Sequence, residues 1–168
     1  MQPVSSPLTH PLAIYFRHNL WSNLLLFDTC LRLDETQLDY SIEGAYGSIK
    51  STLRHITGAE ERYIFHITGG KQSAEASRPT SAASLAELRA RVAASGETLL
   101  QLATSLDGSI RVLVGAGDDA ILIPVEALLL QAIHHAHEHR TQIETMLGQL
   151  GIDPPGLSGW RYFVEQIK

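Results

Sequence analysis

The sequence predicts an all-α fold, a four-helix bundle formed by a single domain that spans residues 1–168. Apolar residues recur at three- and four-residue intervals in four long stretches, which is the pattern of amphipathic helices. Polar or glycine-rich breaks separate these stretches, and 44% apolar residues against 18% charged residues is enough for a packed core. Four such helices bury their apolar stripes most simply by packing against one another.

The first predicted helix covers residues 11–33, and Pro11 suits its first turn because that position needs no backbone N–H donor. The second covers residues 48–68 and is stopped by Gly69 and Gly70, since glycine readily adopts the backbone conformation that ends a helix. A polar stretch, residues 71–80, then crosses to the next element.

The third predicted helix covers residues 84–106. Ser84 and Glu87 have the spacing of a capping box, in which each side chain accepts a hydrogen bond from a free backbone N–H. Residues 110–123 are different, because they contain two short apolar runs around a glycine-rich turn. This segment is consistent with a short hairpin or with an extended loop.

The fourth predicted helix covers residues 124–150 and ends at Gly151. A short tail, residues 160–167, is expected to add a final helical turn or two. The long connections after the second and third helices allow crossover connections, so an up-down-up-down order is not assumed.

Composition excludes several classes of function. The net charge is -5 and lysine and arginine do not cluster, so binding to nucleic acid or to an anionic membrane surface is not expected. No apolar run approaches the roughly 20 residues needed to span a bilayer, and residues 1–11 lack the pattern of a signal peptide. The single cysteine, Cys30, permits neither an intrachain disulfide nor a cysteine-based zinc cage. We therefore expect a soluble, cytoplasmic protein.

Eight histidines are present, and four of them lie between positions 134 and 139. Because a helix turns about 100° per residue, His139 lies about 40° from His135, one turn further along the same face. His134 and His137 fall at roughly 260° and 200°, on the opposite face. The face of His135 and His139 also carries the apolar residues that must face the core, namely Leu128, Ala132, Ile143, Met146 and Leu150.

An inward pair with this spacing is typical of two ligands on one metal ion. The other interpretation is a pair of core histidines that only make hydrogen bonds. The second helix offers a third ligand, either His55 or His66, which lie about 16 Å apart along the helix and cannot share an ion. The residues alone leave this choice open. We expect His134 and His137 to be surface residues.

Three stretches resemble the DinB-like (DinB/YfiT) superfamily of metal-binding four-helix proteins. They are residues 19–23 near the start, residues 48–56 around His55, and residues 135–143 with the pattern H-x-x-x-H-R-x-Q. The resemblance implies that His55, rather than His66, joins His135 and His139 as metal ligands. It also implies crossover connections and a homodimer.

Other polar residues beside these motifs are candidates for supporting roles. Glu60 and Glu138 are candidates to hydrogen-bond a ligand and so fix the tautomer of a histidine, and a solvated carboxylate is the alternative for Glu138. Gln142 lies at the border of the inward face, where a structural contact with a neighbouring helix is favoured and a hydrogen bond to a ligand is the alternative. Arg140 is expected to pair with an acidic residue across the bundle.

Three neutral imidazoles leave a divalent ion with an open coordination position, which is typical of catalytic zinc. Zinc is the first expectation, and nickel and iron also suit imidazole ligands. The resemblance implies a metal-dependent enzyme that acts on a small molecule, in stress or detoxification. It would be either an S-transferase that uses a low-molecular-weight thiol or a hydrolase.

Of two other functions considered, the sequence is compatible with one and disfavours the other. A non-catalytic bundle, stabilised by the metal and binding a small ligand or acting in a stress response, is the alternative. A two-iron carboxylate protein fits poorly, because the Glu-x-x-His pairs that it needs are missing.

Overall fold

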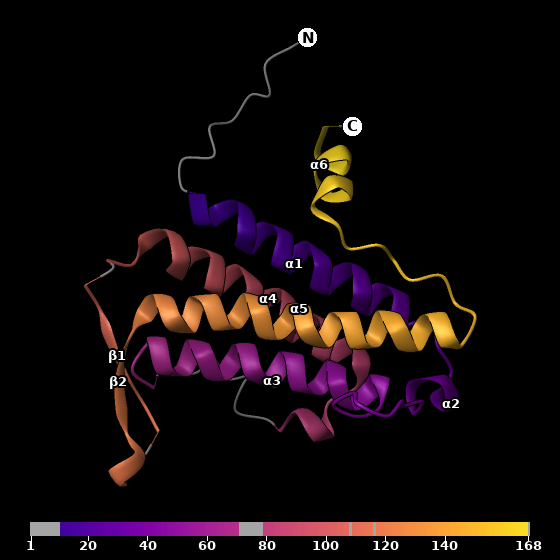
Figure 1. The fold of residues 1–168 in the computed structure, drawn as a ribbon, viewed down its shortest axis with the longest axis horizontal. Helices are drawn as coiled ribbons and strands as arrows, with labels where there is room; N and C mark the ends of the chain where they lie inside the picture. Colours follow the sequence, from indigo (N-terminus) through magenta and orange to yellow (C-terminus); the bar gives the residue numbers. More distant parts are fainter. Residues whose placement is uncertain (1–10, 71–78, 108, 116, 168) are drawn as a thin grey trace.

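The computed structural model describes residues 11–70, 79–107, 109–115 and 117–167. Four long helices form its body: α1 (Pro11–Cys30), α3 (Ile49–Ile67), α4 (Leu85–Ser105) and α5 (Val125–Gln149) (Figure 1). The predicted all-α four-helix bundle is thus confirmed. The predicted absence of a signal peptide concerns residues that are mostly outside the described ranges, as does most of the polar connection at residues 71–80.

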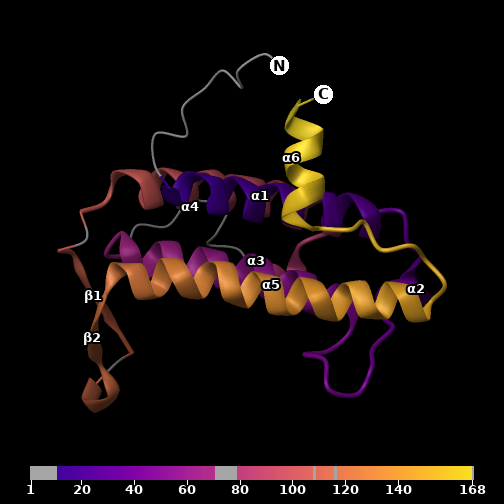
Figure 2. The same cartoon turned by 45° about the horizontal axis from the view of Figure 1, so that its top comes forward.

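The helices do not follow one another around the bundle in chain order. Helices α1 and α5 run in one direction, and α3 and α4 run in the other (Figures 1 and 2). Helix α1 packs on α4, α4 on α3, α3 on α5, and α5 on α1. Consecutive helices α1 and α3 therefore lie across the bundle, as do α4 and α5, so the chain makes the crossovers that were expected.

Local sequence explains where the helices begin and end. The Ser84 side chain accepts from the Glu87 N–H, and the Glu87 carboxylate accepts from the Ser84 N–H, so the predicted capping box is present. The first helix is shorter than predicted, because its last turn tightens with an Arg32 N–H donating to the Thr29 carbonyl. Asp34 then caps a separate short helix, α2 (Glu35–Leu38), which apolar periodicity did not indicate.

The segment before α5 forms a hairpin that extends from one end of the bundle (Figure 1). Strand β1 (Arg111–Val114) pairs antiparallel with β2 (Ile121–Pro124), and a short 3-10 turn, η3 (Gly117–Asp119), lies between them. Val112 is buried at the hairpin base, in a small apolar cluster with Val125 and Leu128. Of the two interpretations of this segment, the hairpin is therefore the one found.

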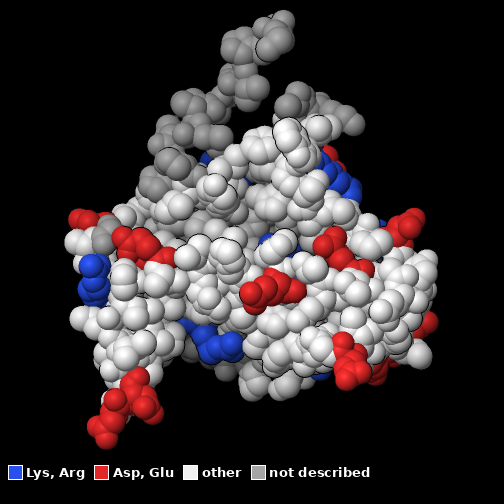
Figure 3. Space-filling view, viewed as in Figure 1, with Lys and Arg blue, Asp and Glu red and all other residues white. Residues whose placement is uncertain are grey.

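The predicted C-terminal turns form α6 (Gly159–Ile167), which stands against α1 (Figure 2). A second 3-10 turn, η2 (Thr80–Ala82), precedes α4. Cys30 is fully buried, and this burial raises the pKa of its thiol to about 12, so the thiol is unreactive. No helix in the described part of the chain is both long and apolar enough to cross a membrane. Charged side chains are scattered over the face seen in Figure 3, and most of that face is uncharged.

Candidate metal centre

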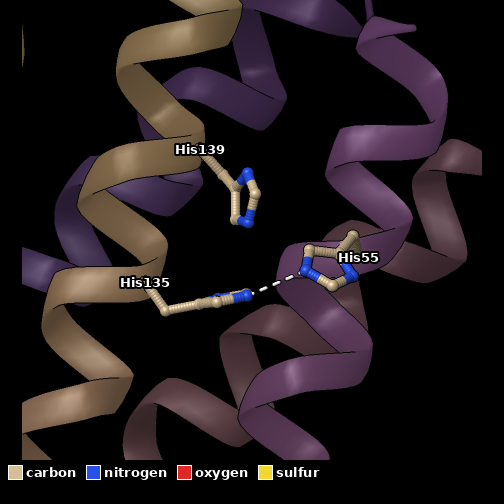
Figure 4. A group of neighbouring side chains, drawn as sticks. All are labelled: His55, His135 and His139. Carbon is tan, nitrogen blue, oxygen red and sulfur yellow. Dashed lines mark hydrogen bonds between the residues drawn. The ribbon is translucent and has the colours of Figure 1, made fainter. Parts of the chain in front are cut away.

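Three imidazoles converge between two neighbouring helices. His55 comes from α3, and His135 and His139 come from successive turns of α5, which runs antiparallel to α3 (Figure 4). The ring centroids lie 4.7 Å apart from His55 to each of the other two and 4.4 Å apart between His135 and His139. One nitrogen from each ring lies within 4.8 Å of the others. This group can hold a metal ion.

The helices hold these side chains at the border between core and solvent. His139 is only 9% exposed, and His55 and His135 are partly buried. The residue one turn before His139 on the same face is His135, and the small residues Ala132 and Ala136 of the same helix are buried. His135 and His139 therefore lie on the inward face of α5, as the turn of about 100° per residue predicted.

The protonation state of the cluster suits metal binding. Burial, followed by repulsion from neighbouring imidazoles, lowers the pKa of both His55 and His135 from 6.5 to about 4. Both rings are consequently neutral at neutral pH, and a neutral ring nitrogen has the lone pair that a metal ion needs.

The spacing of the nitrogens is close to that of a metal site. The His135 and His55 Nε2 atoms are 2.8 Å apart and share a hydrogen bond (Figure 4). Two nitrogens at about 2.0–2.1 Å from one tetrahedral zinc lie roughly 3.4 Å apart, so the two rings need to separate by about half an ångström. A small side-chain rotation provides that, and the donor set of three imidazoles fits a divalent ion such as zinc.

Gln142 orients the most buried of the three histidines. The Nδ1–H of His139 donates to the Gln142 Oε1 over 3.0 Å, which leaves Nε2 of that ring as the nitrogen with a lone pair. The same oxygen accepts the backbone N–H of Tyr46 over 3.1 Å. Gln142 thus connects a histidine of α5 to the loop that precedes α3.

Replacing Gln142 by alanine is expected to weaken metal binding about tenfold or more, because hydrogen-bond partners of ligands contribute roughly that much. Metal affinity would be measured by competition with a chromophoric chelator. Glu138→Ala is the matched control, since Glu138 is exposed on the same helix and makes no hydrogen bond to the three histidines among the described residues. Equal affinity in wild type and Gln142→Ala would contradict the orienting role.

Two tyrosines flank the imidazoles. The ring of Tyr46 stacks on His55 with centroids 3.9 Å apart, and it meets His139 edge-on at 5.3 Å. Tyr63 of α3 meets His135 edge-on at 6.0 Å. Sequence reasoning missed Tyr46, because it lies in the loop between α2 and α3, where no helical periodicity indicates which way a side chain faces.

Glu60 lies away from the histidines that it was predicted to support. It is 1% exposed, and its hydrogen bonds come from the amides of Asn19 and Asn23, at 3.0 and 2.8 Å, and from the Ser95 hydroxyl at 2.5 Å. Burial raises the pKa of Glu60, and these donors act in the opposite direction because they stabilise the carboxylate. Glu60 points across the core toward α1 and α4, because its position on α3 is offset from that of His55.

Arg140 reaches the same network from the opposite side. Its Nη1 donates to the side-chain oxygens of Asn19 and Asn23, at 2.7 and 2.6 Å. Burial lowers the pKa of Arg140 to about 10, so it is still charged at neutral pH. The acidic residue across the bundle from Arg140 is Glu60, and the two amides lie between them, so the expected pairing is made through Asn19 and Asn23. We call Asn19, Asn23, Glu60, Ser95 and Arg140 the buried polar network.

The remaining candidates are separate from the cluster. His134, His137 and Glu138 are exposed on α5, as their helical phase predicted for the two histidines. His66 lies in the last turn of α3 with its ring against Phe65, and it is not part of the group that can hold a metal. The choice of His55 over His66, which rested on a family resemblance, agrees with this grouping.

Comparison with known proteins identifies the family. No curated protein matches the chain. The model of the DinB family matches residues 8–167, which is nearly the whole sequence and includes all three histidines of the cluster. With the helical bundle and the histidine cluster already described, the chain belongs to the DinB family.

Proposed function

We propose that the protein is a metal-dependent enzyme that transfers a low-molecular-weight thiol onto a small electrophile. The observation that carries the proposal is the cluster of three imidazoles, which among the described residues includes no cysteine or carboxylate as a fourth ligand. A divalent ion bound there keeps a coordination position open and lowers the pKa of a thiol or water that enters it. In this proposal the ion is zinc, and nickel and iron are the other metals that imidazole ligands suit. The proposal also includes the homodimer that the family resemblance implies.

The surroundings of the imidazoles favour thiol transfer over hydrolysis. Glu60 is occupied in the buried polar network, and Glu138 makes no hydrogen bond to the three histidines. A thiol that has lost its proton to solvent is itself a strong nucleophile, whereas hydrolysis gains from a general base that accepts a second proton. No such base contacts the imidazoles among the described residues, so the site suits the reaction that needs less proton transfer.

Side chains beside the cluster supply walls for a small substrate. Tyr46 is 54% exposed although its ring stacks on His55, so it presents an aromatic residue to solvent next to the imidazoles. Tyr63 lies at the His135 side. A flat apolar electrophile gains from burial against such rings.

The test is thiol consumption with chlorodinitrobenzene as the electrophile. The thiol sulfur forms a bond to the ring carbon, the carbon–chlorine bond breaks, chloride leaves and the thiol proton goes to solvent. We expect zinc-loaded protein to accelerate this reaction with at least one of cysteine, glutathione and coenzyme A, and the metal-free protein and His139→Ala to lose the acceleration. Nitrophenyl acetate serves as the substrate for hydrolysis.

A different result would favour the non-catalytic alternative. If zinc raises the melting temperature but the protein accelerates neither reaction, the bundle uses the ion for stability alone. Ester hydrolysis without thiol consumption would replace the transferase by the hydrolase.

A further inference from the structure

The three histidine ligands would not neutralise the charge of a bound divalent ion. Neutral imidazoles contribute no negative charge, so a divalent ion on them keeps its full positive charge. The face seen in Figure 3 shows basic atoms along α3 and acidic atoms on α5, with uncharged surface between them. On α3, the arginine that lies on the same side of the helix as His55 is Arg62.

Arg62 lies two helical turns after His55 on the same side of α3, since seven residues return a helix to nearly the same angle. Its guanidinium extends back along the helix. The Nη1 atom lies 3.4 Å from the position that a Cβ on Gly58 would take. Gly58 is three residues from His55, or about 4.5 Å along the axis. The positive group is therefore within the length of a small molecule from the imidazoles.

The guanidinium is available to a ligand. Arg62 is exposed, and it forms no ion pair among the described residues, whereas the nearby Arg91 is bound to Glu61. A Cβ at Gly58 would be in ordinary van der Waals contact with both Nη1 and Thr80, so the guanidinium lies directly over this turn of α3. An arginine fork of this kind matches the two oxygens of a carboxylate.

We propose that Arg62 binds a carboxylate of the thiol substrate, so that the preferred thiols are small molecules that carry a carboxylate a few bonds from the sulfur. This inference rests on the proposed function. The sulfur end faces the three imidazoles, and the carboxylate end lies over the Gly58 turn of α3. Tyr63, the residue after Arg62, meets the His135 ring edge-on.

The test compares two thiols that differ in charge and little in size, mercaptopropionate and mercaptopropanol. Their binding to zinc-loaded protein is measured by titration calorimetry at low salt, for wild type, Arg62→Gln and Arg62→Lys. Arg17→Gln is the matched control, since it removes an exposed arginine from α1 and changes the net charge equally.

We expect wild type to bind mercaptopropionate about two- to fivefold more tightly than mercaptopropanol, as is usual for a solvent-accessible ion pair. Arg62→Gln should remove this preference without changing the affinity for mercaptopropanol. Arg62→Lys should keep part of the preference, and Arg17→Gln all of it. Added salt should reduce the preference in wild type.

The two proposals fail in different ways. A preference that persists in Arg62→Gln, or that is absent in wild type, overturns the role of Arg62 while thiol binding itself stands. If neither thiol binds to zinc-loaded wild type, the proposed function fails, and the inference about Arg62 fails with it.

Discussion

Replacing His135 by alanine is expected to abolish the binding of one divalent ion per chain, whereas the same change at His134 leaves it intact. His135 faces His55 and His139 inside the cluster, and His134 is exposed one residue earlier on the same helix. Four-ligand zinc sites supply about 10–16 kcal/mol, so removal of one ligand of three should weaken binding on the order of a hundredfold or more.

Elemental analysis of protein dialysed against a metal-buffered solution measures this loss. His55→Ala and His139→Ala should behave like His135→Ala, and His137→Ala should behave like His134→Ala. Circular dichroism verifies that every variant keeps its helices. Equal metal loss in His134→Ala and His135→Ala would mean that binding is a property of the histidine-rich surface and not of the cluster.

Arg140→Ala is expected to lower the free energy of unfolding by about 3–5 kcal/mol, because removal of one member of a buried charged pair leaves the other uncompensated. Arg140 and Glu60 are 2% and 1% exposed, and the amides of Asn19 and Asn23 join them. Without the guanidinium, two amide oxygens lose their donor and the Glu60 carboxylate is left without its buried counter-charge. Urea unfolding of the metal-free protein measures the change.

Arg89→Ala is the matched control. Arg89 binds Asp28 through two hydrogen bonds between α4 and α1, but its side chain is 36% exposed and that of Asp28 is 45% exposed. Solvent weakens such a pair, so its loss should cost less than about 1 kcal/mol. A cost for Arg140→Ala no larger than that for Arg89→Ala would mean that the buried polar network is not stabilised by its charges.

The sequence predicted which side of α5 is buried, but it did not predict which side chains of the neighbouring helix lie against that side. The 100° turn per residue separated His135 and His139 from His134 and His137, because it depends on α5 alone. It did not decide between His55 and His66, which depends on the direction in which α3 passes α5. The family resemblance supplied that choice.

Glu60 shows the same limit in a different form. Its phase on α3 was compatible with the interior, but the side chains of α1 and α4 decide what it meets there. Asn19 and Asn23 offer two amides one turn apart, which satisfy a carboxylate better than a single imidazole would. Tyr46 and the short helix α2 were missed because they lie between the long helices, where local caps rather than periodicity determine the backbone.

The buried polar network also affects how the bundle unfolds. Its five side chains come from all four long helices: two from α1 and one each from α3, α4 and α5. Detachment of any one of these helices would strand buried partners on at least one other, and a stranded buried group costs more than the hydrogen bond itself is worth. Partial unfolding of the bundle is therefore penalised at each helix, and the four helices should exchange their core amide hydrogens as one cooperative unit.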